Sequence, residues 1–210
     1  MKKLALLSLF VFNAIISVHA QGFLHGLGLK AGPSFTNVSS PSSLLHGAQT
    51  GFTAGIFKAP NNNKLLGLRI ELLYLKQSYS QGNASNAGEA SLDYISWSNM
   101  LNVNITKYFS CMIGEQLSYL LNAKADSSFN IAGAGSYTQI LKYFNRIDFG
   151  LTAGMEIHPF KGIGIGARYT WSVLNMFKSS FDSIQSSGGG SFGNMNQRIN
   201  VLQLFLSYKF

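Results

Sequence analysis

Residues Arg146–Ile157 read RIDFGLTAGMEI, in which large apolar residues alternate with small or polar ones. Side chains point to opposite faces of a β-strand in turn, so this stretch predicts a strand with one apolar and one small or polar face. A soluble antiparallel sheet gives the same alternation and buries its apolar face. This stretch alone therefore does not decide which face meets water.

The repetition of this alternating pattern along the chain decides which face meets water. Alternating stretches occur at Phe23–Phe35, Thr50–Lys58, Leu65–Gln77, Leu92–Lys107, Phe109–Asn122, Tyr143–His158, Gly162–Leu174 and Gln197–Phe210. The connections are alternately long and short, and the short ones are Ala59–Lys64, Tyr108 and Pro159–Lys161. Outer-membrane barrels have short periplasmic turns and long extracellular loops. The sequence therefore predicts an all-β fold, an eight-stranded antiparallel up-and-down transmembrane β-barrel.

The residues on the two predicted faces support a membrane barrel. One face of the seventh stretch carries large side chains such as Ile165 and Trp171, and the other carries Gly164, Gly166 and Arg168. Large apolar groups outside and small or polar groups inside reverse the arrangement of a soluble barrel. Aromatic residues are expected at the two membrane rims. The rim near the short turns would hold Phe57, Tyr108, Phe109, Phe160, Tyr208 and Phe210, and the other rim Tyr74, Trp97, Tyr119, Tyr143, Phe144 and Trp171.

Two polar residues interrupt the outward faces. Asn99 and Glu115 fall in the outward phase of the fourth and fifth stretches, and a β-bulge in either strand would re-aim them. Cys111 is the only cysteine, which excludes an intrachain disulfide, and we interpret it as a small apolar residue.

The N-terminus predicts export. Lys2 and Lys3 precede an apolar run, Leu4–Val18, that ends in Val18-His19-Ala20, a small-x-small cleavage pattern. We expect a signal peptide at residues 1–20 and a single barrel domain at 21–210. Removing two of the 16 basic residues leaves 14 against 8 acidic ones, so the net charge falls from +8 to +6.

The chain has no basic run or nucleic-acid motif, and five lysines fall at or beside the short turns. These are Lys58, Lys64, Lys107, Lys161 and Lys209.

Charged residues in the inward phase form the main candidate site. They are Lys30, Arg69, Glu71, Arg146, Asp148, Glu156 and Arg168. Eight strands leave an interior about wide enough for side chains to fill, and a buried charge needs a partner. We therefore expect a mixed-sign network that plugs the barrel; the alternative is a gated polar path.

Four motifs resemble one known family. They are Gly28–Phe35, Glu71–Tyr74, Gly162–Tyr169 and the ending Leu204–Phe210, and the likeness to the PorT-like outer-membrane β-barrel proteins of Bacteroidetes-type bacteria runs along the whole mature chain. The resemblance implies an outer-membrane location among lipids and lipopolysaccharide. It also implies that Phe210 is recognised by the barrel-assembly machinery. It implies no enzyme activity and no cofactor. Members are often labelled porins, and the name-giving member is tied to a secretion system.

Other candidate sites are weaker. An outer-membrane lipid-modifying enzyme would need a cluster such as His46, Ser91 and Asp93 near the outer rim. The histidines His25, His46 and His158 lack metal-ligand spacing. The glycines at 162, 164 and 166 lie in a predicted strand with no helix after it, unlike a dinucleotide fingerprint.

We therefore expect a non-enzymatic barrel whose extracellular loops contact envelope proteins, secretion-system proteins or surface ligands. The principal alternative is a narrow porin-like diffusion channel.

Overall fold

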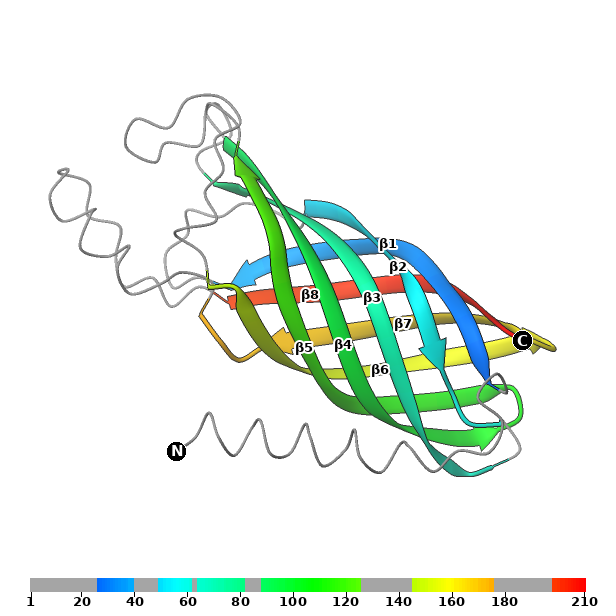
Figure 1. Cartoon of the computed structure of the whole chain (residues 1–210). Coiled ribbons are helices and arrows are strands. Elements are labelled where there is room, and N and C mark those ends of the chain that lie inside the picture. The colour runs from blue at the N-terminus through cyan, green and yellow to red at the C-terminus, as the bar shows by residue number, and fades with distance from the viewer. Residues whose placement is uncertain (1–25, 40–48, 62–63, 82–87, 126–144, 176–197) are drawn as a thin grey trace, which may run out of the picture.

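The computed structural model describes residues 26–39, 49–61, 64–81, 88–125, 145–175 and 198–210. They form eight strands, labelled in Figure 1. The strands are β1 (Leu27–Ser39), β2 (Gln49–Lys58), β3 (Leu66–Gln81), β4 (Gly88–Thr106), β5 (Phe109–Ala125), β6 (Ile147–Phe160), β7 (Ile163–Ser172) and β8 (Arg198–Lys209). Among these residues no helix is long and apolar enough to span a membrane.

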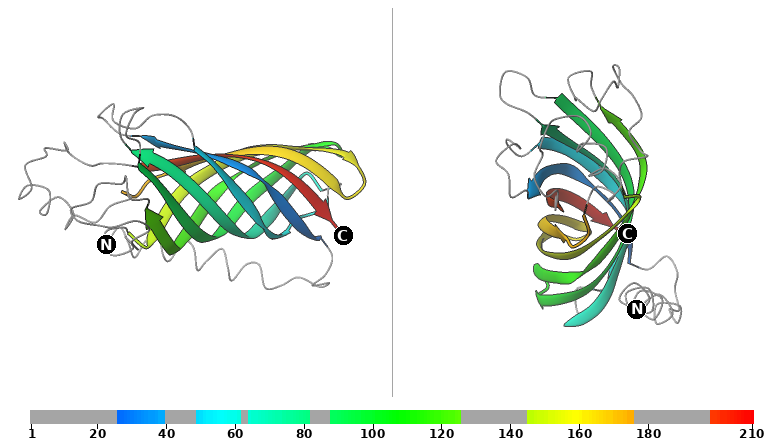
Figure 2. Two further views of the ribbon diagram at one scale, coloured as in Figure 1. Left: turned by 90° about the horizontal axis from the view of Figure 1, so that it is seen from above. Right: turned by 90° about the vertical axis from the view of Figure 1, so that its left-hand side faces the viewer.

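Each strand pairs antiparallel with its sequence neighbour, and β1 also pairs with β8, so the sheet is a closed barrel. The pair Gly28↔Lys209 lies near one end of the β1–β8 seam, and Ser39↔Arg198 lies at the other. Figure 2 shows the strands inclined to the barrel axis and wrapping around it. Closure pairs both edges of the sheet, as a membrane-spanning sheet requires. The predicted fold class and strand order are confirmed.

The two ends of the barrel differ. The connections 59–65, 107–108 and 161–162, together with the end of β8, define one end, which we call the short-turn end. The opposite end is the long-loop end. Gly162 has a φ of +83° in the β6–β7 turn, a conformation that side chains disfavour, and so permits a tight reversal.

Several strand boundaries differ from the prediction: β1 ends at Ser39 rather than Phe35, and β5 ends at Ala125 rather than Asn122. The β3–β4 ladder continues past Gln77↔Leu92 to Gln81↔Gly88, because backbone pairing extends through polar segments that lack an alternating pattern. Conversely, β6 begins at Ile147 rather than Tyr143, and Tyr119↔Ile147 ends its ladder with β5. Arg146 therefore precedes the strand.

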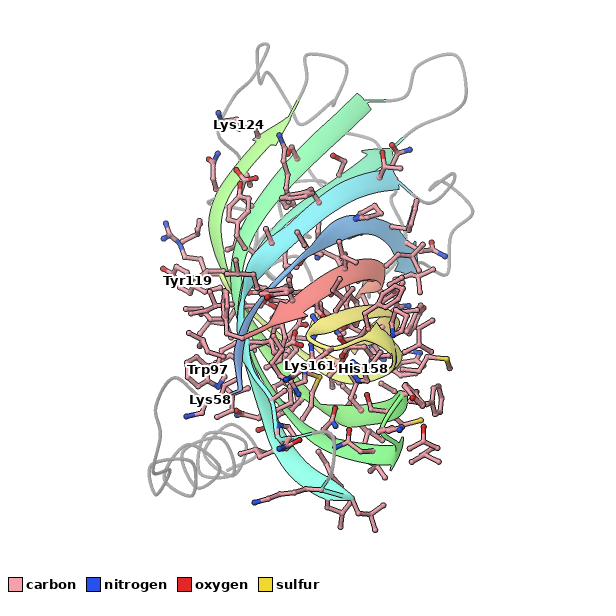
Figure 3. The ribbon with its side chains drawn as sticks, turned by 90° about the vertical axis from the view of Figure 1, so that its right-hand side faces the viewer. Lys58, Trp97, Tyr119, Lys124, His158 and Lys161 are labelled. Atoms are coloured by element: carbon pink, nitrogen blue, oxygen red, sulfur yellow. The ribbon has the colours of Figure 1, made fainter. Side chains whose placement is uncertain are left out.

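The faces follow the predicted phase. Ile113 on the outer face is 61% exposed, whereas Ser98 and Gln203 on the inner face are fully buried. Figure 3 looks into the short-turn end, and Trp97 and Tyr119 lie outside the wall. The interior is not uniformly small or polar, however. Its long-loop half is filled by buried apolar side chains, namely Leu75, Leu92, Tyr94, Leu120, Ala123, Ile199 and Val201.

Asn99 and Glu115 remain in the outward phase. The register of β4 and β5 shifts only between Asp93 and Tyr94 and between Asn104 and Thr106, so no bulge re-aims this pair. The two residues face each other across the strands, and both are buried, at 4% and 8% exposure. Trp97 Nε1 donates a hydrogen bond of 3.0 Å to Asn99 Oδ1.

Candidate functional site

Glu71 on β3 is the centre of the buried interior network. Its carboxylate accepts from Lys30 Nζ of β1 at 3.1 Å, Arg69 Nε at 2.7 Å and Arg168 Nη1 of β7 at 2.6 Å. All four residues are at most 2% exposed. Such charge-assisted bonds offset the large cost of taking ions out of water. The alternating phase of these strands brings the groups together, because each charge points inward at a similar height.

Arg69 links this centre to a second carboxylate. Its Nη1 donates to Glu156 Oε2 of β6, and Ser207 Oγ of β8 donates to Glu156 Oε1. A Cβ at position 164 would overlap Glu156, so Gly164 leaves the space that this carboxylate occupies. The network therefore crosses the lumen from β1 and β3 to β6, β7 and β8.

Neutral polar residues complete the network around Arg168. Its Nε and Nη2 donate to Gln203 Oε1 at 3.1 and 2.7 Å, and Nη2 also reaches Gln116 Oε1 at 3.3 Å. Ser98 Oγ donates to the same Gln116 oxygen at 3.4 Å. The sequence prediction missed these residues, although their inward phase was readable. An amide or a hydroxyl indicates a buried partner less strongly than a charge does.

Two aromatic rings lie inside the barrel against the cations. Phe57 was expected at the membrane rim, but it is 2% exposed, and the Arg69 guanidinium carbon lies 4.3 Å from its ring centre. Lys30 Nζ similarly lies 3.7 Å from the ring centre of Phe205. Cations are attracted to aromatic faces, and more strongly when water is excluded. Cβ atoms at Gly28 and Gly166 would overlap these rings, so glycine on one strand makes room for an aromatic residue on another.

The structure brings five of the seven predicted interior charges together. Lys30, Arg69, Glu71, Glu156 and Arg168 form the network, but Arg146 is not in the interior. It is exposed at the long-loop end, where its Nη1 donates to Tyr119 Oη at 3.1 Å, because β6 starts after it. Asp148 points inward but lies apart from the other charges and accepts from Ser172 Oγ.

The weaker candidate sites do not assemble among the described residues. Asp93 accepts from Tyr74 Oη at 3.0 Å and Asn122 Nδ2 at 3.3 Å, while Ser91 pairs with Lys124 across the ladder. His25 and His46 lie outside the described residues. Where the chain is described, no three His, Cys, Asp or Glu side chains are grouped to hold a metal ion. Gly164 and Gly166 lie within β7, and Phe210 is 65% exposed with its ring edge-on to Tyr208.

Comparison with known proteins agrees with this fold. The outer membrane protein beta-barrel domain family matches residues 20–178. Neisserial surface protein A is similar in structure, with a TM-score of 0.57 and 18% identity over 88% of this chain and 97% of that one. Ail of Yersinia pestis, solved with the heparin analogue sucrose octasulfate, gives a TM-score of 0.52 and 16% identity over 89% and 99%. None of the curated proteins matches the chain significantly.

Proposed function

Because this chain belongs to the outer membrane protein β-barrel domain family and lies in the bacterial outer membrane, we propose that it is a closed, non-enzymatic barrel that presents interaction loops. The observation that carries this proposal is the network centred on Glu71. Three cations and two carboxylates from β1, β3, β6 and β7 meet in one layer. An eight-stranded lumen is only about wide enough for such side chains.

A closed lumen leaves specific contacts to the parts of the protein outside it. The apolar side chains of the long-loop half lie above the charged layer, so a polar solute would meet both a dry segment and paired charges. The outer face of the barrel is apolar, as lipid contact requires. The long connections are thus the segments left for specific contacts with envelope proteins, secretion-system proteins or surface ligands.

The four motifs also support placing the chain with the PorT-like members of this family. The motif Gly162–Tyr169 comprises the β6–β7 turn and much of β7, including Arg168 of the network. The ending Leu204–Phe210 supplies the short-turn end of β8. This closer kinship supports a protein partner in the envelope, and assembly by the barrel machinery through Phe210.

Co-isolation tests the interaction role. The full chain would be affinity-purified from native outer membrane beside a variant in which residues 126–144 are replaced by a short glycine-serine segment. The expected result is a specific co-isolated protein or glycolipid that the variant loses while its barrel still folds. Equal recovery of the same material with both chains, after each long connection has been replaced in turn, would contradict the proposal.

A narrow diffusion channel is the competing function, favoured by the polar side chains in the short-turn half of the lumen. Proteoliposomes that swell in small sugars or amino acids distinguish the two functions. The closed barrel predicts swelling no faster than in protein-free liposomes, and fast swelling would favour the channel.

A further inference from the structure

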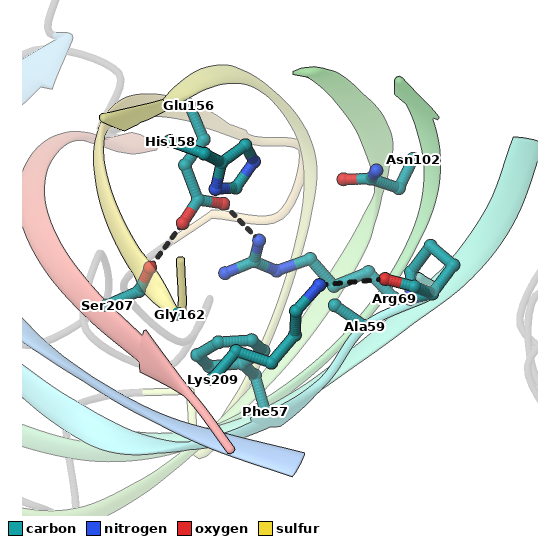
Figure 4. Close-up of a pocket in the computed structure, with 10 residues that line it drawn as sticks. Phe57, Ala59, Arg69, Asn102, Glu156, His158, Gly162, Ser207 and Lys209 are labelled. Carbon is teal, nitrogen blue, oxygen red and sulfur yellow. Dashed lines mark hydrogen bonds and ion pairs between the residues drawn. The ribbon is translucent and has the colours of Figure 1, made fainter. Parts of the chain in front are cut away.

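The interior opens into a small cavity at the short-turn end (Figure 4). Its polar lining includes Arg69, Asn102, Glu156, His158 and Lys209. A volume of about 20 Å³ is open to the centre of a water-sized molecule. This is room for about one water molecule or one ion of similar size.

One strong donor in this lining lacks a partner. Arg69 is 1% exposed, and its Nε and Nη1 are bound to Glu71 and Glu156. Its Nη2 has no hydrogen-bond partner among the described residues. A buried donor without an acceptor costs about 1–3 kcal/mol, and more when the group is charged. The Nη2 group is therefore available to an acceptor in the cavity.

The charge around the cavity is also unbalanced. Within the lining, the Arg69 guanidinium faces one carboxylate, that of Glu156. Lys209 adds a further cation to the lining, donating to the Pro60 carbonyl at 3.1 Å. Glu156 is the acidic side chain of the lining, and both its oxygens already accept from Arg69 and Ser207. A group with negative charge would balance this excess.

The surrounding surface has the same sign. The described residues at the short-turn end include the lysines at 58, 64, 107, 161 and 209, whereas the nearby acidic side chains, Glu71 and Glu156, are buried in the network. A concentration of one sign of charge around a low-dielectric opening raises the local concentration of counter-ions. Figure 3 shows Lys161 and His158 near the mouth of the barrel.

We propose that this cavity binds a small monovalent anion of the size of chloride, held by Arg69 Nη2 and Lys209. The enclosed volume matches a single compact ion. A water molecule alone would satisfy Arg69 Nη2 and the unpartnered Oδ1 of Asn102, but it would leave the excess positive charge. The site is separate from the long loops and stands whether or not the barrel conducts.

Chloride titration of the isotope-labelled full chain in uncharged detergent tests the site by nuclear magnetic resonance. Saturable shifts of the Gly162 and Ser207 amide signals are expected. Lys209→Gln should weaken binding roughly threefold to tenfold, since it removes one partly exposed cation. Lys107→Gln, an exposed lysine beside Tyr108 at the same end, is the matched control and should bind like the wild type.

Arg69→Gln should abolish binding, but it also breaks two buried ion pairs, so Lys209→Gln decides the matter if Arg69→Gln does not fold. Absence of saturation would mean that the cavity holds water only and would overturn the proposal. Equal weakening by Lys107→Gln and Lys209→Gln would overturn it too, because that result indicates general screening by surface lysines.

Discussion

Glu71 and Glu115 are two buried glutamates in opposite settings. Glu71 faces inward and neutralises three cations, whereas Glu115 is in the outward phase and its Oε1 has no partner among the described residues. Glu71→Gln should therefore destabilise the barrel by about 3–5 kcal/mol, because it leaves buried cations uncompensated. Glu115→Gln, the same chemical change, should cost less than about 1 kcal/mol, since Oε1 accepts no hydrogen bond that the substitution would break.

Denaturant unfolding of the two variants in detergent, followed by the gel shift between folded and unfolded barrel, measures this difference. Equal loss of stability would mean that the interior pairs contribute no more than the outward-facing carboxylate. The comparison needs no assumption about orientation in the membrane.

At the scale of elements, the alternation of short turns and long connections predicts how the barrel sits in the membrane. Lys124 near the end of β5 and Lys161 in the β6–β7 turn are both exposed, at opposite ends. With Cys111 replaced by Ser, Lys124→Cys should react with a membrane-impermeant thiol reagent on intact cells. Lys161→Cys should react only after the cells are lysed. Labelling of Lys161→Cys alone on intact cells would mean that the topology is inverted.

The last strand carries a second prediction. The ring of Phe210 is exposed and touches Tyr208 edge-on at a centroid distance of 5.2 Å. Its backbone N–H donates one hydrogen bond of 2.9 Å to the Leu27 carbonyl, so the residue adds only this bond at the end of the closed ladder. Deleting Phe210 should lower the amount of barrel assembled in the outer membrane while leaving the unfolding midpoint of assembled barrels nearly unchanged. Normal outer-membrane levels of the truncated chain, measured against the full chain expressed in parallel, would contradict the assembly role.

For the whole molecule, strand number, pairing order and face assignment could be predicted, because each depends on a period of two that is visible along the chain. Features that depend on where a strand ends, or on which side chain lies opposite across the lumen, could not be predicted. The phase predicts Arg146 inside only if the alternation continues beyond the start of β6 at Ile147. Nothing in the strand of Phe57 indicates the space that Gly28 leaves for its ring. The missing hydrogen-bond partner of Arg69 Nη2 could not be predicted either, because it depends on how three strands are positioned in the folded barrel.

The central claim is that paired charges close the lumen, and single-channel recording in planar bilayers tests it most directly. The unmodified barrel should pass little or no steady current. Arg168→Ala should admit a small leak, since Arg168 bridges Glu71, Gln116 and Gln203 across the lumen, while the exposed Arg146→Ala should remain as closed as the wild type. Large, regular conductance steps from the unmodified protein would contradict the account and identify the barrel as a channel.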